Sequence, residues 1–101
     1  SPEEAAAPAP APVPARLEIA DIARQPRLWP REVVLSASQR FPVVMNGINV
    51  GSVQVPAGRP VLLRKVSGDG TVEIEFQGSA AKVKARATDL IERATARAAA
   101  P

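Results

Sequence analysis

The sequence predicts an all-β protein, a small barrel of five to six strands with a short helix before it and another after it. From Arg31 onward, apolar residues recur with a period of two, which is typical of strands that bury one face. Tight-turn sequences separate these segments, at Asn46-Gly47, Pro56-Ala57-Gly58 and Ser67-Gly68-Asp69-Gly70. Short strands joined by such turns indicate a small barrel or sandwich.

Four parts are expected along the chain. Residues 1–15 are rich in Ala and Pro, and their alternating prolines fix φ and remove hydrogen-bond donors. We predict a disordered, extended tail that acts as a spacer. We prefer this to a PxxP-type ligand, because Arg16 is the only basic residue near the run. The other parts are a helix and Trp-Pro connector at 16–30, the barrel at 31–90 and a C-terminal helix at 89–101.

The segment before the barrel contains a predicted helix over residues 16–24. Ile19, Ile22 and Ala23 fall on one helical face, and the next proline ends the helix. Trp29 then precedes a second proline, which biases it towards an extended conformation. We expect Trp29 to cover an open end of the core rather than to form a platform for a ligand.

Six strands are expected in the barrel, at residues 32–36, 42–46, 48–55, 60–66, 71–77 and 80–86. Gly47 completes the strongest short hairpin signal, Asn46-Gly47, because a type I′ turn needs positive φ at both central residues. Gly78-Ser79 fits a type II′ turn, which has glycine first. Gly51 lies inside a strand and indicates a bulge or a sharp bend at a barrel corner.

The last hairpin has a predicted register that follows from a turn at Gly78-Ser79. This register places Phe76 opposite Ala81, Ile74 opposite Val83, Val72 opposite Ala85, Glu75 opposite Lys82 and Glu73 opposite Lys84. Apolar pairs then share one face and opposite charges share the other. Phe76 is therefore expected in the core. In residues 61–66 the side chains can alternate either way, so their inward and outward assignment stays open.

A C-terminal helix is expected to run from residue 89 to about residue 99. Asp89 and Glu92 have the spacing of a capping box, with Asp89 as the N-cap. Leu90, Ile91 and Ala94 are the residues able to dock this helix on the barrel.

The composition excludes most catalytic chemistry. The chain has no Cys and no His, so it lacks a thiol nucleophile, thiolate metal ligands and an imidazole base. Glu73 and Glu75 lie two residues apart on one predicted strand, opposite lysines, and we interpret them as an exposed charge ladder rather than a catalytic pair. A Ca²⁺ site at residues 67–70 would offer one carboxylate, where about six oxygen ligands are needed. We expect no enzyme activity, no cofactor and no metal.

The possible ligand surface is a basic stripe, formed by Arg64, Lys65, Lys82, Lys84 and Arg86. The whole chain has 13 Lys and Arg against 10 Asp and Glu, for a net charge of +3 at pH 7. Such a stripe suits a phosphate backbone, so a small basic nucleic-acid-binding barrel is the alternative function. The stripe has no neighbouring aromatic residue for base stacking, and the acidic ladder dilutes its charge. We therefore expect a solvated face and no tight nucleic-acid binding.

Several short segments together point to a known kind of domain. They are Phe41-Pro42-Val43, Val50-Gly51-Ser52-Val53, Val55-Pro56-Ala57-Gly58, Val66-Ser67-Gly68-Asp69, Val72 and Thr88-Asp89-Leu90. With these segments, the stretch from Trp29 to Leu90 resembles a bacterial SH3-like domain. With its Ala/Pro tail and Trp-Pro pair, the chain is similar to a group of exported bacterial proteins.

The resemblance implies a non-catalytic binding or structural accessory module whose ligand is an unknown protein or a component of the cell envelope. SH3-like barrels host many unrelated activities. The groove that grips PxxP ligands is lined with Tyr and Trp, and this chain has no Tyr. The late Gly-Trp pair and the early Arg-Ser-Gly-Pro-like stretch of cell-wall-targeting members are also missing, so neither activity is carried over.

The expected location, from the same resemblance, is periplasmic or exported, with the cytoplasm as the alternative. Residue Ser1 opens a polar Ala/Pro-rich stretch that does not have the pattern of a signal peptide. No apolar run reaches the roughly 18 residues that a membrane span needs. The sequence leaves the oligomeric state open.

Overall fold

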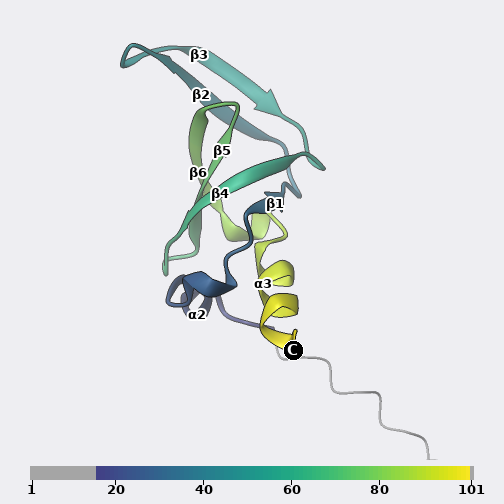
Figure 1. The fold of residues 1–101 in the computed structure, drawn as a ribbon. Helices are drawn as coiled ribbons and strands as arrows, with labels where there is room; N and C mark the ends of the chain where they lie inside the picture. The colour runs from purple at the N-terminus through teal and green to yellow at the C-terminus, as the bar shows by residue number, and fades with distance from the viewer. Residues whose placement is uncertain (1–15, 101) are drawn as a thin grey trace, which may run out of the picture.

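Two antiparallel sheets make up most of the structure, a computed structural model that describes residues 16–100 (Figure 1). The larger sheet has the strand order β1-β4-β5-β6, and the smaller pairs β2 with β3. The strands are β1 Glu32–Val34, β2 Gln39–Met45, β3 Ile48–Val55, β4 Pro60–Val66, β5 Thr71–Phe76 and β6 Ser79–Lys84. The prediction of a mostly β fold with six strands is confirmed. The predicted tail at residues 1–15 lies outside the described residues.

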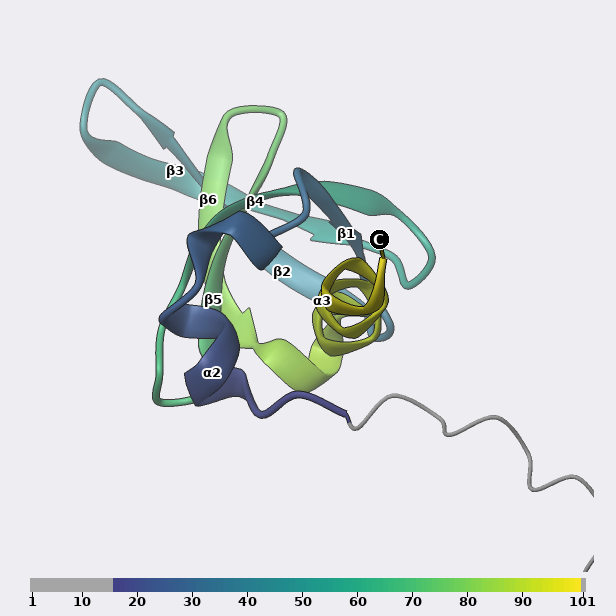
Figure 2. The same cartoon turned by 60° about the horizontal axis from the view of Figure 1, so that its bottom comes forward.

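Helices lie before and after the strands, as predicted. They are α2 Ile19–Ala23, the 3₁₀ helix η1 Pro26–Leu28, the 3₁₀ helix η2 Ala85–Ala87 and α3 Leu90–Ala99. Helices α2 and α3 contact each other at the end of the molecule opposite the β2–β3 hairpin (Figures 1 and 2). Arg16 joins them further, because its Nη2 donates a 2.7 Å hydrogen bond to Glu92 Oε1.

The two sheets do not close into a barrel. Leu35 and Thr88 form an isolated antiparallel bridge that ties the end of β1 to the segment before α3. Strand β2 lies against β6, but no hydrogen-bonded ladder joins these two strands in the described part of the chain. The backbone groups of β2 pair with β3 instead, and Pro42 within it has no N–H to donate. The described strands thus form two adjoining sheets, and the predicted barrel is not closed by hydrogen bonds.

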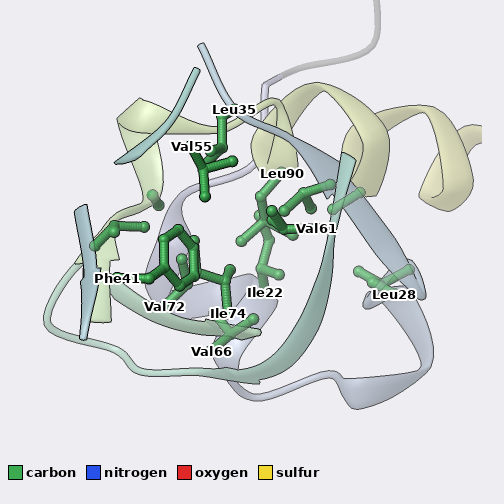
Figure 3. Packing of buried hydrophobic residues seen from close by; sticks show 14 residues of the cluster. Ile22, Leu28, Leu35, Phe41, Val55, Val61, Val66, Val72, Ile74 and Leu90 are labelled. Carbon is green, nitrogen blue, oxygen red and sulfur yellow. The ribbon is translucent and has the colours of Figure 1, made fainter. Parts of the chain in front are cut away.

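The core lies between the larger sheet, the base of the β2–β3 hairpin and the helices (Figure 3). Phe41 is its largest fully buried side chain, and its ring centroid lies 6.1 Å from that of Phe76. Helices α2 and α3 contribute Ile22 and Leu90, both with no exposed surface. Both sheets and the helices therefore contribute side chains to one apolar cluster, which stabilises the fold as a single unit.

Two aromatic side chains lie at the rim of this core. Phe76 is half-buried, which corrects the prediction that it is a buried core residue. It is the last residue of β5, and the guanidinium carbon of Arg59 lies 5.4 Å from its ring centroid. Trp29 is also half-buried and packs on the core, while its Nε1 donates a 2.7 Å hydrogen bond to the carbonyl of Ile22. The indole therefore covers one end of the core, in the position expected for it.

The turn between β5 and β6 differs from the predicted one by a residue. Gln77 and Gly78 are its central residues, with φ of 50° and 83°, so it is a type I′ turn rather than a type II′ turn at Gly78-Ser79. The observed pairs are Phe76 with Ser79, Ile74 with Ala81, Glu73 with Lys82, Val72 with Val83 and Thr71 with Lys84. The predicted register was wrong by two residues. An even shift keeps each side chain on its predicted face, because side chains alternate with a period of two.

The irregular positions in the other strands have local causes. Asn46 and Gly47 have φ of 52° and 78°, which confirms the predicted type I′ hairpin between β2 and β3. Val43 pairs with Gly51 while Val44 pairs with Asn49, so the bulge predicted at Gly51 is present.

Strand β4 has a second irregularity between Leu63 and Lys65. Val61 and Val66 are both buried, although they are five residues apart and would face opposite sides in a regular strand. The bulge adds one extra residue, Arg64, between Leu63 and Lys65, so that Val61 and Val66 face the same side. Because a bulge cannot be seen in the apolar pattern, the sequence alone left the facing of residues 61–66 open.

The start of α3 uses a different capping arrangement from the predicted capping box. Asp89 is the N-cap residue but makes no capping side-chain bond. Its Oδ1 accepts a 2.8 Å bond from the backbone N–H of Val34, and its Oδ2 accepts a 2.7 Å bond from Arg93. Thr88 Oγ1 accepts from the backbone N–H of Leu90 instead. Asp89 thus joins α3 to β1, a role that sequence spacing does not reveal.

Candidate binding surfaces

The predicted basic stripe is assembled from three elements, with Arg64 and Lys65 on β4, Lys82 and Lys84 on β6, and Arg86 in η2. All five side chains are exposed. Arg64 Nε lies 3.5 Å from Glu75 Oε1, and Lys82 is paired in the ladder with Glu73. Carboxylates therefore lie between these cations, as the sequence predicted. The predicted partner of Glu73 was Lys84, but its partner in the structure is Lys82.

Lys84 and Arg86 border an open pocket of about 270 Å³. Its lining consists of Ile19, Asp69, Gly70, Thr71, Lys84, Ala85, Arg86 and Ile91. Asp69 Oδ1 accepts bonds from the Thr71 hydroxyl at 2.7 Å and from the Thr71 backbone N–H at 3.0 Å. These bonds, with a smaller contribution from the charge of Lys82, lower the pKa of Asp69. An ionised carboxylate thus lies beside the two cations, which disfavours an anionic ligand.

This mixed charge predicts that nucleic acid binds weakly. A protein that neutralises several phosphates loses affinity steeply with salt, with a slope near −0.9 per contact on duplex DNA. We expect no more than about two or three such contacts here, because Arg64 and Lys82 already face glutamates. Fluorescence anisotropy with duplex and single-stranded oligonucleotides should show no sub-micromolar binding at about 0.15 M salt. Tight binding that is lost when Lys82, Lys84 and Arg86 are replaced would contradict this.

Residues 16–100 contain no group of three or more Asp, Glu, His or Cys side chains arranged to hold a metal ion. None of the helices in this part of the chain is long and apolar enough to cross a membrane.

A second surface, which we call the apolar hairpin, is formed by β2 and β3. This hairpin extends away from the rest of the molecule (Figures 1 and 2). Its exposed apolar residues are Val44, Met45, Ile48, Val50 and Val53, with between 36% and 65% of their surface accessible. Single exposed apolar residues are common on protein surfaces, but five on one short hairpin make it a candidate interaction surface.

One face of the apolar hairpin continues the core face of β2 and β3 outward, and Val44 lies on the other face. Phe41 pairs with Val53, and Met45 pairs with Ile48 near the tip. Residues that are directly opposite in an antiparallel ladder share a face, and so do residues two apart on one strand. Phe41 and Met45 therefore lie on the same face of β2, yet Phe41 is fully buried and Met45 is 60% exposed. The difference arises because the hairpin extends beyond the sheet that would cover it.

The apolar hairpin also lacks charge. Residues 41–58 contain no Asp, Glu, Lys or Arg. Arg40, at the base of β2, donates a 2.9 Å bond to Ser52 Oγ and is the one charged residue of the two strands. This surface therefore favours an apolar partner over an ionic one.

Sequence reasoning missed the apolar hairpin because it assigned these residues to a closed barrel. Alternation of apolar residues predicts that a strand has one apolar face, but it does not say whether another layer covers that face. The 18-residue interval without charge, from residue 41 to residue 58, is the signal that was available.

Comparisons of the chain with models of protein families, with curated protein sequences and with solved structures find no match.

Proposed function

We propose that the chain is a non-catalytic binding or structural accessory module of an exported bacterial protein, and that the apolar hairpin is its docking surface. One observation carries the proposal: a hairpin without charge between residues 41 and 55 presents five exposed apolar side chains that lie outside the cluster of core residues. Exposed apolar surface of this kind is typical of a site that a partner covers.

The architecture that we propose for this module is SH3-like. The support for it is the set of short sequence segments between Trp29 and Leu90 that resemble such a domain, together with six short strands joined by tight turns. The gap between the hydrogen-bonded ladders of β2 and β6 is that of a partly open barrel.

Photo-crosslinking tests the docking surface even when the partner is unidentified. Benzoylphenylalanine would replace Ile48 in the apolar hairpin, and in a matched control it would replace Leu62, an apolar residue of β4 that is also exposed. We expect discrete protein adducts from position 48 in the cells that make the protein, and none from position 62. Equal adducts at both positions, or none at position 48, would overturn the proposal.

A third position addresses the alternative function. Benzoylphenylalanine in place of Lys82 samples the basic stripe, which would contact the nucleic acid if the alternative were correct. Adducts to DNA or RNA from position 82, without protein adducts from position 48, would replace the docking proposal by the nucleic-acid-binding one.

A further inference from the structure

We propose that the partner of the apolar hairpin is a second copy of this chain, which pairs with the outer edge of β3. Two hairpins would then form one sheet in the order β2-β3-β3-β2 about a two-fold axis. This inference rests on the proposed function only in that both assign binding to the apolar hairpin.

The outer edge of β3 is free to accept another strand. β3 pairs with β2 along one edge from Ile48 to Val55, except at Val50, which the bulge leaves without a partner in the ladder. No backbone hydrogen bond joins its other edge to any element of residues 16–100. Free N–H and C=O groups along an edge are a template for strand pairing, and proteins usually block them with charged residues or Pro. β3 has no charged residue and no Pro, and it is the longest strand of the fold. Its one irregularity is the bulge beside Gly51.

The distribution of charge favours an identical partner at this edge. Each copy carries a net charge of +3, so two copies repel each other wherever their basic surfaces meet. Strand β6, at one edge of the larger sheet, carries the exposed residues Lys82 and Lys84. β3 carries no charge, and β2 carries only Arg40. The apolar hairpin is therefore the surface at which two copies approach with least repulsion.

The geometry of the edge also suits a symmetric pair. An antiparallel pair of identical strands is self-complementary, as a two-fold interface requires. Eight residues span about 27 Å of edge, at about 3.4 Å per residue. Only three of the five exposed apolar residues, Ile48, Val50 and Val53, lie on β3 itself, so the paired edges form a small contact beside a standard interface of about 800 Å² per partner. We therefore expect a reversible dimer rather than an obligate one.

Sedimentation analysis of the full chain over a range of concentrations tests the pairing. We expect the mass to rise from 10.6 kDa towards twice that value. Val50→Lys places a charge in β3 and should weaken the dimer at least tenfold. Leu62→Lys makes the same kind of change on exposed β4 and should leave the dimer unchanged. A wild-type chain that stays monomeric up to about 1 mM, or equal weakening by both variants, would overturn the inference.

Hydrogen exchange separates edge pairing from simple side-chain contact. The amides of β3 that point away from β2 should exchange more slowly as the concentration rises, since pairing protects them. A dimer in which no amide of Ile48–Val55 gains protection would overturn the edge-pairing geometry. Adducts from position 48 to a different protein, with a monomeric wild-type chain, would leave the proposed function standing and end this inference alone.

Discussion

Phe41→Ala is expected to lower the free energy of unfolding by about 3–5 kcal/mol, the largest loss for any single truncation in this chain. Phe41 has no exposed surface, and it is the largest side chain in the core. A domain of this size has about 5–15 kcal/mol of stability in total, so this loss removes a large part of it. Urea unfolding followed by the fluorescence of Trp29, the one tryptophan of the chain, measures the change.

Phe76→Ala is the matched control, because it removes the same atoms from a half-buried position. Its ring lies beside Phe41 but also under Arg59 at the surface. We expect a smaller loss than for Phe41→Ala, because less apolar surface returns to water. A loss at Phe76 equal to or greater than that at Phe41 would mean that the base of the hairpin is packed differently.

Leu90→Ala should cost about 2–5 kcal/mol and release α3 from the sheet. Leu90 is the first residue of α3 and has no exposed surface, and Ala94 is the other buried residue of this helix. A ten-residue helix is marginal in water without tertiary contacts, so loss of the Leu90 contact should also lower the helix content. Urea unfolding and far-ultraviolet circular dichroism report the two effects separately.

Arg93→Ala provides the comparison for Leu90→Ala. The Arg93 guanidinium pairs with Asp89 at 2.7 Å, but the pair is partly exposed, and an exposed pair within one helix contributes less than about 1 kcal/mol. If Leu90→Ala is no more costly than Arg93→Ala, α3 is an appendage rather than part of the folded unit.

Turn chemistry is the reason that much of the fold was predictable from the sequence. Asn46-Gly47 has one strongly favoured hairpin geometry, and it places the turn and the whole of β3 where they were expected, although β2 begins three residues earlier than predicted. Two other features were also marked by nearby residues: the bulge by Gly51 within a strand, and the docking of α3 by Leu90 and Ala94 on its apolar side.

Features that depend on distant contacts were predicted less well. Gln77 adopts a positive φ that non-glycine residues seldom take. For this reason the turn between β5 and β6 is centred on Gln77-Gly78, one residue before the predicted Gly78-Ser79. Phe41 and Phe76 lie on strands with the same apolar period, so the pattern could not tell which of them is central. The bulge at Leu63 and Lys65 altered the facing of β4 in the same way.

Of the two candidate surfaces, the sequence predicted the basic stripe but not the apolar hairpin. Cations such as Lys82 and Lys84 are easy to find, but the register that places Glu73 against Lys82 depends on the turn at Gln77. The apolar hairpin was hidden for the opposite reason, since its residues have the pattern of a core strand. Whether Met45 and Ile48 are covered depends on how far β2 and β3 extend past the larger sheet, which is a property of the tertiary structure.

If the apolar hairpin serves docking and not folding, the double variant Met45→Lys/Ile48→Lys should be as stable as the wild-type chain. The measurement is urea unfolding of both proteins, each dilute enough to be monomeric. Both side chains are at least 60% exposed, so we expect free energies of unfolding that agree within about 0.5 kcal/mol. A loss of more than about 2 kcal/mol would instead place these residues in the core and show that the hairpin is needed for folding.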